Sequence, residues 1–235
     1  MPSRFVRRSA ATILSAIAFA SASAQAPAAK SSGWTPLFDG SSTDAWRGYK
    51  MTTMPEGWSI KNGELVKSKP VEDLISRGEW ANFELELEWK IGTGGNSGVF
   101  YRSTEEYPKV YWSATEYQLL DDAVHPDGKN ALTSAAAAYG LYPPPRGVVK
   151  AANEWNTTRI VARGTHVEHW LNGQKVVEYD YGSPDWTAKV KASKFSEWPN
   201  YGKATKGHIA IQGDHNGDLA LRNIRIREIS LKEPK

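Results

Sequence analysis

The chain has 235 residues, no cysteine and a formal net charge of +3. Without cysteine it forms no disulfides and no thiolate metal sites, and it has no cysteine nucleophile. Arginines at positions 4, 7 and 8 account for the whole positive excess, so the remainder of the chain is electrically neutral. This balance gives no electrostatic reason to expect nucleic acid or an anionic membrane as a partner.

The first 24 residues have the pattern of a secretory signal peptide. Basic residues precede an apolar run, which ends at the small residues Ala22-Ser23-Ala24. The run is too short to span a membrane. We therefore expect cleavage after Ala24, a flexible lead-in over residues 25–32, a single domain over residues 33–231, and a periplasmic or secreted location. The sequence does not distinguish Sec-dependent export from twin-arginine export, and it does not predict an oligomeric state.

The expected elements that follow are mostly short strands. "WSIKNGELV" predicts a hairpin that turns at Asn62-Gly63. "FELELEWK", residues 83–90, alternates strictly between apolar and charged residues, which is typical of a half-buried antiparallel strand. We expect Phe83, Leu85, Leu87 and Trp89 to face the core.

Two more hairpins and a long closing strand complete the pattern. Turns are expected near Arg163-Gly164 and at Asn172-Gly173, and the change of apolar phase in residues 219–231 predicts a bulge near Arg227. A short helix capped by Ser183 and a long loop over residues 130–147 interrupt the strands. Many short strands separated by turn signals predict an all-β sandwich of two antiparallel sheets.

Aromatic residues are abundant, with ten Trp and ten Tyr. In secreted β proteins such rings often stack on sugars, but tryptophans packed in the core of a sandwich give the same composition. The sequence leaves both interpretations open for each ring.

The stretch "EYQLLDDAVHPDGK", residues 116–129, combines a strand with an acidic loop. Glu116 and Gln118 share one strand face, where a partly desolvated carboxylate would have the raised pKa of a general base. The loop could hold a divalent metal through Asp121 and His125, with Asp122 or Asp127 helping, or His125 could act directly as an acid or base. An ordinary turn at His125-Pro126 and Asp127-Gly128 is the structural alternative.

Other polar residues lie on expected strands and turns. In "GGNSGVFYR", alternation places Arg102 on the face of Asn96. In "VEHWLNG", His169 falls in an apolar phase, as a core histidine would, while Glu168 and Trp170 face outward as candidate sugar contacts. "GHIAIQGDH" offers Gln212 for sugar hydroxyls and His215 as a second acid or base. Lys189, Lys191 and Lys194 are expected on a solvated helix face.

Several phrases in a fixed order resemble the 3-keto-disaccharide hydrolase domain family. They include "WTPLFDGSSTDAWRGY", "GGNSGVFYR", "EYQLLDD", "NEWNTTRIVARGTHVEHWLNG" and "GHIAIQGDHNGDLALRNIRIREI". The resemblance implies a concanavalin A-like jelly-roll fold and action on glycosides that carry a ketone at carbon 3. The chain departs from the family pattern at "TSAAAAYGLYPPP", which holds the candidate substrate contacts Tyr139 and Tyr142, and at the extra residue beside His215.

The implied chemistry needs a base at carbon 2, an acid for the leaving oxygen and a donor or cation at the enolate oxygen. We expect Glu116 to be the base and Arg102 to steady the enolate, with His125 and His215 as further acid–base candidates. Substrate contacts are expected from Asn96, Gln118, Gln212, Glu168, Trp170, Tyr139 and Tyr142. No cofactor is expected with certainty, and a divalent metal is a candidate.

Two alternatives remain open from the sequence. The domain could be a non-catalytic carbohydrate-binding module, which would present a flat aromatic strip to solvent. Alternatively, Glu84, Glu86 and Glu88 are similar to the acidic strand of laminarinase-like retaining glycosidases, which would use Glu84 and Glu88.

Overall fold

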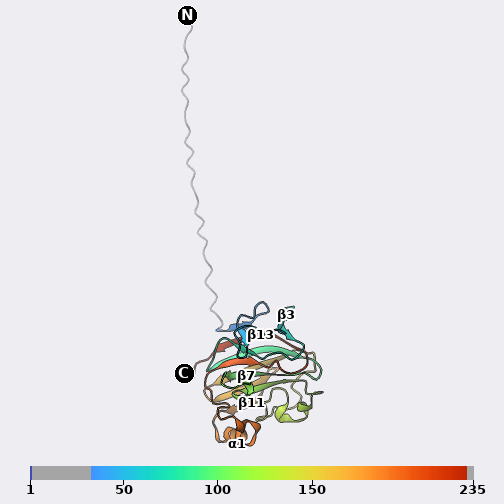
Figure 1. Cartoon of the computed structure of the whole chain (residues 1–235), viewed down its shortest axis with the longest axis vertical. Coiled ribbons are helices and arrows are strands. Elements are labelled where there is room, and N and C mark those ends of the chain that lie inside the picture. The colour runs from blue at the N-terminus through green and yellow to red at the C-terminus, as the bar shows by residue number, and fades with distance from the viewer. Residues whose placement is uncertain (2–32, 232–235) are drawn as a thin grey trace. The chain divides into compact units, whose positions relative to one another are not determined.

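The computed structural model describes Met1 and residues 33–231. The expected signal peptide, apart from Met1, and the expected lead-in therefore lie outside the described residues. Two antiparallel sheets form the domain, as expected for a concanavalin A-like jelly-roll sandwich (Figure 1). The larger sheet has the order β11 (Gln174–Asp180), β10 (His166–Leu171), β9 (Asn156–Arg163), β6 (Phe83–Ile91), β13 (Leu219–Glu228), β4 (Glu64–Lys67) and β3 (Ser59–Lys61), with β1 (Thr35–Phe38) also paired to β13.

The smaller sheet carries the candidate site. Its order is β2 (Trp46–Gly48), β5 (Leu74–Ser76), β12 (His208–Ile211), β7 (Asn96–Ser103) and β8 (Thr115–Leu120). The described helices are short: α1 (Pro184–Ala192) and the 3₁₀ turns η1 (Val110–Trp112), η2 (Pro126–Lys129), η3 (Ala131–Thr133) and η4 (Lys194–Glu197).

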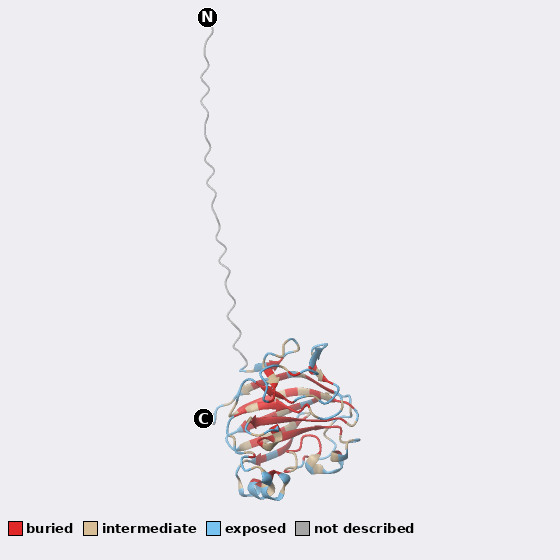
Figure 2. Cartoon of the chain, viewed as in Figure 1, coloured by how far each residue is buried: buried red, intermediate tan, exposed pale blue. Residues whose placement is uncertain are grey.

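The core lies between the two sheets, where Figure 2 shows the strands mostly buried. The expected inward face of β6 is confirmed, because Phe83, Leu85, Leu87 and Trp89 are at most 3% exposed. The opposite face of β6 carries glutamates that pair with arginines of β9 and β13. Because apolar and charged residues alternate strictly along β6, its apolar side chains face the core and its glutamates face the outer side of the sheet.

The expected turns are found where Asn-Gly pairs allow a positive φ. Asn62 has φ 52° and Asn172 has φ 50°, so both hairpins use left-handed backbone. The expected bulge near Arg227 is wrong in position, since Arg227 pairs regularly with Glu84. The register shifts between Arg222 and Arg225 instead, because Leu221 and Ile224 are both buried although they are three residues apart.

Helix α1 lies beside β11 at one end of the sandwich (Figure 1). The expected cap is confirmed: the Ser183 hydroxyl accepts a hydrogen bond from the Trp186 amide at 3.1 Å. The ring of Trp186 stacks on Tyr179 of β11 with centroids 5.0 Å apart. Of the ten tryptophans, Trp46, Trp58, Trp89 and Trp186 are core residues at 7% exposure or less.

None of the helices in residues 33–231 is long and apolar enough to cross a membrane.

Candidate active site

A polar cavity of about 200 Å³ lies on the outer face of the smaller sheet. Strands β7 and β8 supply its floor, and its walls come from four connections: β7–β8, β8–β9, β11–β12 and β12–β13. Its position follows from alternation along β8, because Tyr117 and Leu119 point into the core and leave Glu116 and Gln118 on the opposite face. The lining residues are Asn96, Tyr111, Glu116, Gln118, Asp127, Tyr139, Lys194, Gln212, Asp214 and His215.

Glu116 is the buried carboxyl group of this cavity. It is only 7% exposed, and burial raises its pKa to about 8, although the nearby ammonium group of Lys194 opposes the shift. We orient the side-chain amide of Gln118 so that its nitrogen faces Glu116. This nitrogen then donates to Glu116 Oε1 and to the carbonyl of Ser97, each at 3.0 Å. We prefer this orientation to one that bonds only the Thr133 carbonyl at 3.3 Å, because it satisfies both atoms of the amide. A pKa near 8 is suited to a general base at neutral pH.

The alanine-rich loop forms one wall by pairing with the edge of β8. The Ala136 amide donates to the Gln118 carbonyl at 2.8 Å, and the Tyr139 amide donates to the Glu116 carbonyl at 3.1 Å. The loop is anchored from the larger sheet by His169, whose Nδ1 lies 2.9 Å from the Ala136 carbonyl oxygen. These bonds hold Tyr139 at the cavity.

His169 itself is a core histidine, as the apolar phase of its strand predicts. It is fully buried, and its Nε2 lies 2.7 Å from the Tyr101 hydroxyl. Burial lowers its pKa to about 4, so the ring is neutral at physiological pH.

Tyr139 and Lys194 are in contact at the cavity. The Lys194 ammonium lies 4.6 Å from the centroid of the Tyr139 ring, and the Tyr139 hydroxyl is 3.5 Å from Asp127 Oδ2. Burial raises the pKa of Tyr139 to about 12, so its hydroxyl is a proton donor at neutral pH. A cation and a hydroxyl donor therefore lie in the same cavity as the buried carboxyl group.

The loop after β12 supplies the remaining wall. Buried Lys67 donates to the carbonyl of His215 at 2.7 Å, and buried Asp73 accepts from the Gly213 amide at 2.7 Å. Partial burial lowers the pKa of His215 and outweighs the opposing effect of Asp214. His215 is thus a largely neutral imidazole at the rim, able to accept or deliver a proton.

Three oxygen atoms of the lining residues have no hydrogen-bond partner within the protein. They are buried, and they belong to Asn96, Gln212 and Asp214. Buried acceptors in folded proteins are normally paired. Three residues that line the cavity therefore each keep an acceptor atom that no hydrogen bond within the protein satisfies.

Arg102, expected on the face of Asn96, does not line the cavity. A bulge ends the regular alternation of β7: Arg102 has φ 54°, and the register to β12 shifts between His208 and Ala210. Its guanidinium group donates to the carbonyls of Ala81 and Gly164. The cation that lines the cavity is Lys194 of η4, which is solvent-exposed, as expected, but also borders the cavity.

Three other expected substrate contacts also lie elsewhere. Glu168 and Trp170 are on the outer face of the larger sheet, where the Trp170 indole donates to Glu168 Oε2 at 2.7 Å. Tyr142 stacks on Tyr179 and donates to Asp185 at 2.7 Å. All three are partly exposed. Glu168 and Trp170 lie on a strand, and alternation cannot tell which of the two sheets a strand residue will join, whereas Tyr142 lies in a loop.

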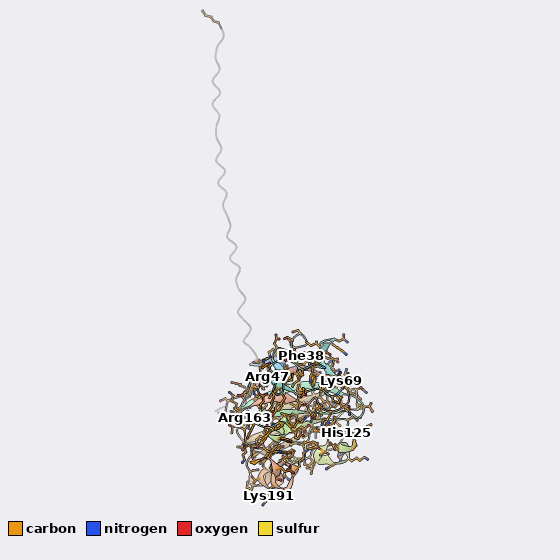
Figure 3. The ribbon with its side chains drawn as sticks, viewed as in Figure 1. Phe38, Arg47, Lys69, His125, Arg163 and Lys191 are labelled. Carbon is orange, nitrogen blue, oxygen red and sulfur yellow. The ribbon has the colours of Figure 1, made fainter. Side chains whose placement is uncertain are left out.

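His125 lies in the loop before η2, toward the periphery (Figure 3). Its Nδ1 accepts the Asp127 amide at 3.2 Å, so this nitrogen caps the turn, while Asp127 itself reaches the cavity. The dipeptides His125-Pro126 and Asp127-Gly128 thus form the turn that was the structural alternative for this stretch.

The candidate metal ligands are engaged with backbone amides. Asp121 accepts from Gly94 at 2.7 Å and from Ala123 at 3.2 Å, and Asp122 accepts from Ala135 at 2.8 Å. Within residues 33–231, metal-binding side chains converge at one other place, where ligand atoms of His166, Glu168 and Glu178 lie within 4.8 Å of one another. The ammonium group of Lys175 contacts both of these glutamates and compensates part of their charge.

A larger hollow of about 710 Å³ lies on the outer face of the larger sheet and includes Glu86 and Glu88. Its size does not make it the better catalytic candidate, because Glu84, Glu86 and Glu88 are all held in ion pairs with arginines. Burial would raise the pKa of Glu88, but hydrogen bonds from Asn223 and Arg222 outweigh it and lower the pKa. A general acid of a retaining glycosidase needs the opposite shift.

The fold and the cavity together define a class: a jelly-roll sandwich with a polar cavity and a buried carboxyl group on the outer face of one sheet. The sequence matches the family model of the 3-keto-alpha-glucoside-1,2-lyase-like domain over residues 33–227. The chain therefore belongs to this family, in agreement with the resemblance noted from its motifs.

Similar proteins agree with this assignment. A 3-keto-disaccharide hydrolase from Bacteroides thetaiotaomicron is 35% identical over 227 residues, covering 83% of this chain and 78% of the relative. Two crystal structures of candidate glycosyl hydrolases from Parabacteroides distasonis are also similar. The first is 29% identical with a TM-score of 0.79, and the match covers 84% of this chain and 94% of that chain. The second is 32% identical with a TM-score of 0.66, and the match covers 83% of this chain and 99% of that chain. A family GH16 endo-β-1,3(4)-glucanase, 10% identical with a TM-score of 0.50, shares the fold, with 86% of this chain and 92% of its own covered.

Proposed function

We propose that the protein cleaves the glycosidic bond of 3-keto glycosides, including 3-keto disaccharides, by elimination followed by hydration. The observation that carries this proposal is the buried Glu116, whose pKa is raised to about 8, on the floor of a polar cavity. The family membership and the 3-keto-disaccharide hydrolase from B. thetaiotaomicron supply the substrate class.

In the proposed reaction, the Glu116 carboxylate removes the proton on carbon 2, which the neighbouring ketone makes acidic. The electron pair moves into an enediolate, and the developing charge on the carbon 3 oxygen is balanced by Lys194, in place of Arg102. The bond between carbon 1 and the leaving oxygen then breaks, giving an unsaturated 3-keto sugar.

Two groups are placed to protonate the leaving oxygen. The Tyr139 hydroxyl is a proton donor at neutral pH, and the neutral imidazole of His215 can relay a proton from solvent. Addition of water to carbon 1 and return of the proton to carbon 2 complete a net hydrolysis. The unpaired oxygens of Asn96 and Gln212 are proposed to accept hydrogen bonds from sugar hydroxyls, while the Gln118 amide orients the Glu116 carboxyl group.

The aromatic residues next to the cavity are proposed to hold the leaving group. Tyr111 lines the cavity, and Trp112 and Trp198 stack beside it with centroids 5.3 Å apart. Both indoles are partly exposed. A non-catalytic sugar-binding module would also use such rings, but it would not need a buried carboxyl group with a raised pKa beneath them.

The test uses the purified mature protein with 3-keto-trehalose and with unoxidised trehalose, with and without a chelator. We expect the 3-keto substrate alone to be cleaved and the Glu116→Gln variant to be inactive. Glu86→Gln, which alters a carboxylate of the other sheet that pairs with Arg225, is the matched control and should retain activity.

Equal cleavage of both sugars would indicate an ordinary glycosidase. Binding of either sugar without cleavage would indicate a binding module. The comparison with and without chelator tests separately whether a metal is needed. The proposed steps require none, so activity that is lost with chelator and returns with added metal would show that a metal takes part.

We also propose that the protein is exported and that its mature form starts at or near Gln25. N-terminal sequencing of the protein from its native host tests this, and an intact Met1 would contradict it.

A further inference from the structure

Gly98 lies in the middle of β7, directly beneath the carboxyl group of Glu116. It pairs with Gln118 across the β7–β8 ladder, while Glu116 pairs with Phe100, so the Glu116 side chain leans diagonally over the glycine. A methyl group added at Gly98 would lie 2.0 Å from Glu116 Oε1 and 2.7 Å from its Cγ and Cδ. No side chain other than hydrogen leaves room for the carboxyl group in this position.

The backbone gives no other reason for a glycine here. Gly98 is not among the residues with a positive φ, so an L-residue could adopt its conformation. Glycine inside a strand weakens the sheet, because it loses more conformational freedom on folding and has no side chain to pack. The space that it leaves is therefore the feature that requires explanation.

That space is filled by one group. The carboxyl group occupies it, is almost completely shielded from solvent and is in reach of the Gln118 amide at 3.0 Å. On the other side of β7, the backbone amide of Gln212 donates to the Gly98 carbonyl at 2.9 Å and holds this part of the strand in the sheet. Glu116 is thus held against the backbone of the sheet, and the rest of the cavity stays open for a ligand.

We propose that Gly98 is a positioning residue, whose missing side chain forms the seat of the Glu116 carboxyl group and so fixes where this group meets the substrate. The catalytic part of this inference rests on the proposed function. The seat itself is a statement about Glu116 and Gly98 alone, and it can be tested without substrate.

The test variant is Gly98→Ala, and the matched control is Gly48→Ala. Both are strand glycines without a positive φ, and at both the added methyl meets the end of a flexible side chain: at Gly48 it lies 2.4 Å from Met51 Sδ, in an exposed side chain. Gly98→Ala should push the Glu116 carboxyl group into the open cavity, closer to water and to Lys194. Gly48→Ala should leave activity unchanged.

Two activity readouts are expected for Gly98→Ala. The value of kcat/KM should fall by about tenfold or more, since a displacement near 1 Å is costly for a reacting group. The acidic limb of the pH profile should move to lower pH by about one unit or more, because a solvated carboxyl group loses the burial that raises its pKa. A glycine that only supports the strand would lower activity without moving this limb.

Two further readouts need no turnover. The carboxyl carbon of Glu116, followed by NMR in isotopically labelled protein, should titrate at lower pH in Gly98→Ala than in wild type. Gly98→Ala should also lower the unfolding midpoint in the wild-type background and do so much less in Glu116→Ala, where the colliding group is gone. If these results hold and no 3-keto glycoside is cleaved, the seat stands and the proposed function fails.

The inference would be overturned if Gly98→Ala has wild-type activity and an unchanged acidic limb. It would equally be overturned if the loss of stability is the same with and without the Glu116 side chain.

Discussion

Replacing Glu116 by glutamine should make the folded protein more stable, and increasingly so as the pH rises from 5 to 8. The folded-state pKa of Glu116 is raised to about 8 from an ordinary value of 4.5, mainly by burial. Between these two values the unfolded chain ionises this group while the folded protein keeps it protonated. The unfolded state therefore binds fewer protons, and the free energy of unfolding falls as the pH rises through this window.

The size of the effect follows from the two pKa values. Each unit of difference corresponds to about 1.4 kcal/mol, so a shift of about 3.5 units from 4.5 gives an upper bound of about 5 kcal/mol above pH 8. Below pH 4.5 both states are protonated and the cost disappears. A glutamine has nearly the same shape and no ionisation, so the variant should gain roughly 2–5 kcal/mol over wild type at pH 8 and little at pH 4.

The assay is urea unfolding of wild type and Glu116→Gln at several pH values from 4 to 8.5, with the difference in unfolding free energy plotted against pH. Glu86→Gln serves as the control, since its carboxylate is paired with Arg225 on the outer face of the other sheet. A difference that does not change with pH, or one that shrinks as the pH rises, would refute a buried, protonated Glu116.

Three further results are expected. Leu85→Ala should lose roughly 2–5 kcal/mol of stability in denaturant unfolding, because Leu85 is fully buried between Ile160 and Ile226 in the core of the larger sheet; a loss below about 1 kcal/mol would mean that its side chain does not face the core. Lys194→Met should move the acidic limb of the activity profile to higher pH, since Lys194 lowers the pKa of Glu116, and an unmoved limb would remove Lys194 from the site. Asp121→Asn should lower the unfolding free energy by about 1 kcal/mol through its bonds to Gly94 and Ala123, and added metal should not restore what is lost; recovery with a metal would assign Asp121 as a ligand.

Much of the fold could be predicted because it depends on short-range patterns. The alternation of β6, the Asn-Gly turns and the Ser183 cap are each determined by a few adjacent residues. The position of the β13 bulge was missed by a few residues, because the apolar residues 221, 224, 226 and 229 are consistent with more than one break in phase.

The site was predicted only in part, for a physical reason. Alternation grouped Glu116 with Gln118 on one strand face and identified Asn96 and Gln212 as polar positions of two other segments, and strand pairing brings all four to one cavity. Lys194 and Tyr111 reach the cavity from loops, whose course depends on long-range packing that no periodicity encodes. The outward face of the larger sheet gives the same sequence pattern as that of the smaller sheet, which explains why Glu168 and Trp170 were grouped with Glu116.

In the proposed reaction Glu116 removes the proton from carbon 2. The most direct measurement is exchange of the carbon 2 hydrogen of a 3-keto glycoside with deuterated water, in wild type and in Glu116→Gln. We expect wild type to incorporate deuterium and the variant to be slower by about 10²–10⁴-fold, with ligand binding retained. Exchange in the variant above about one tenth of the wild-type rate would contradict the claim and transfer the role of base to His215 or His125.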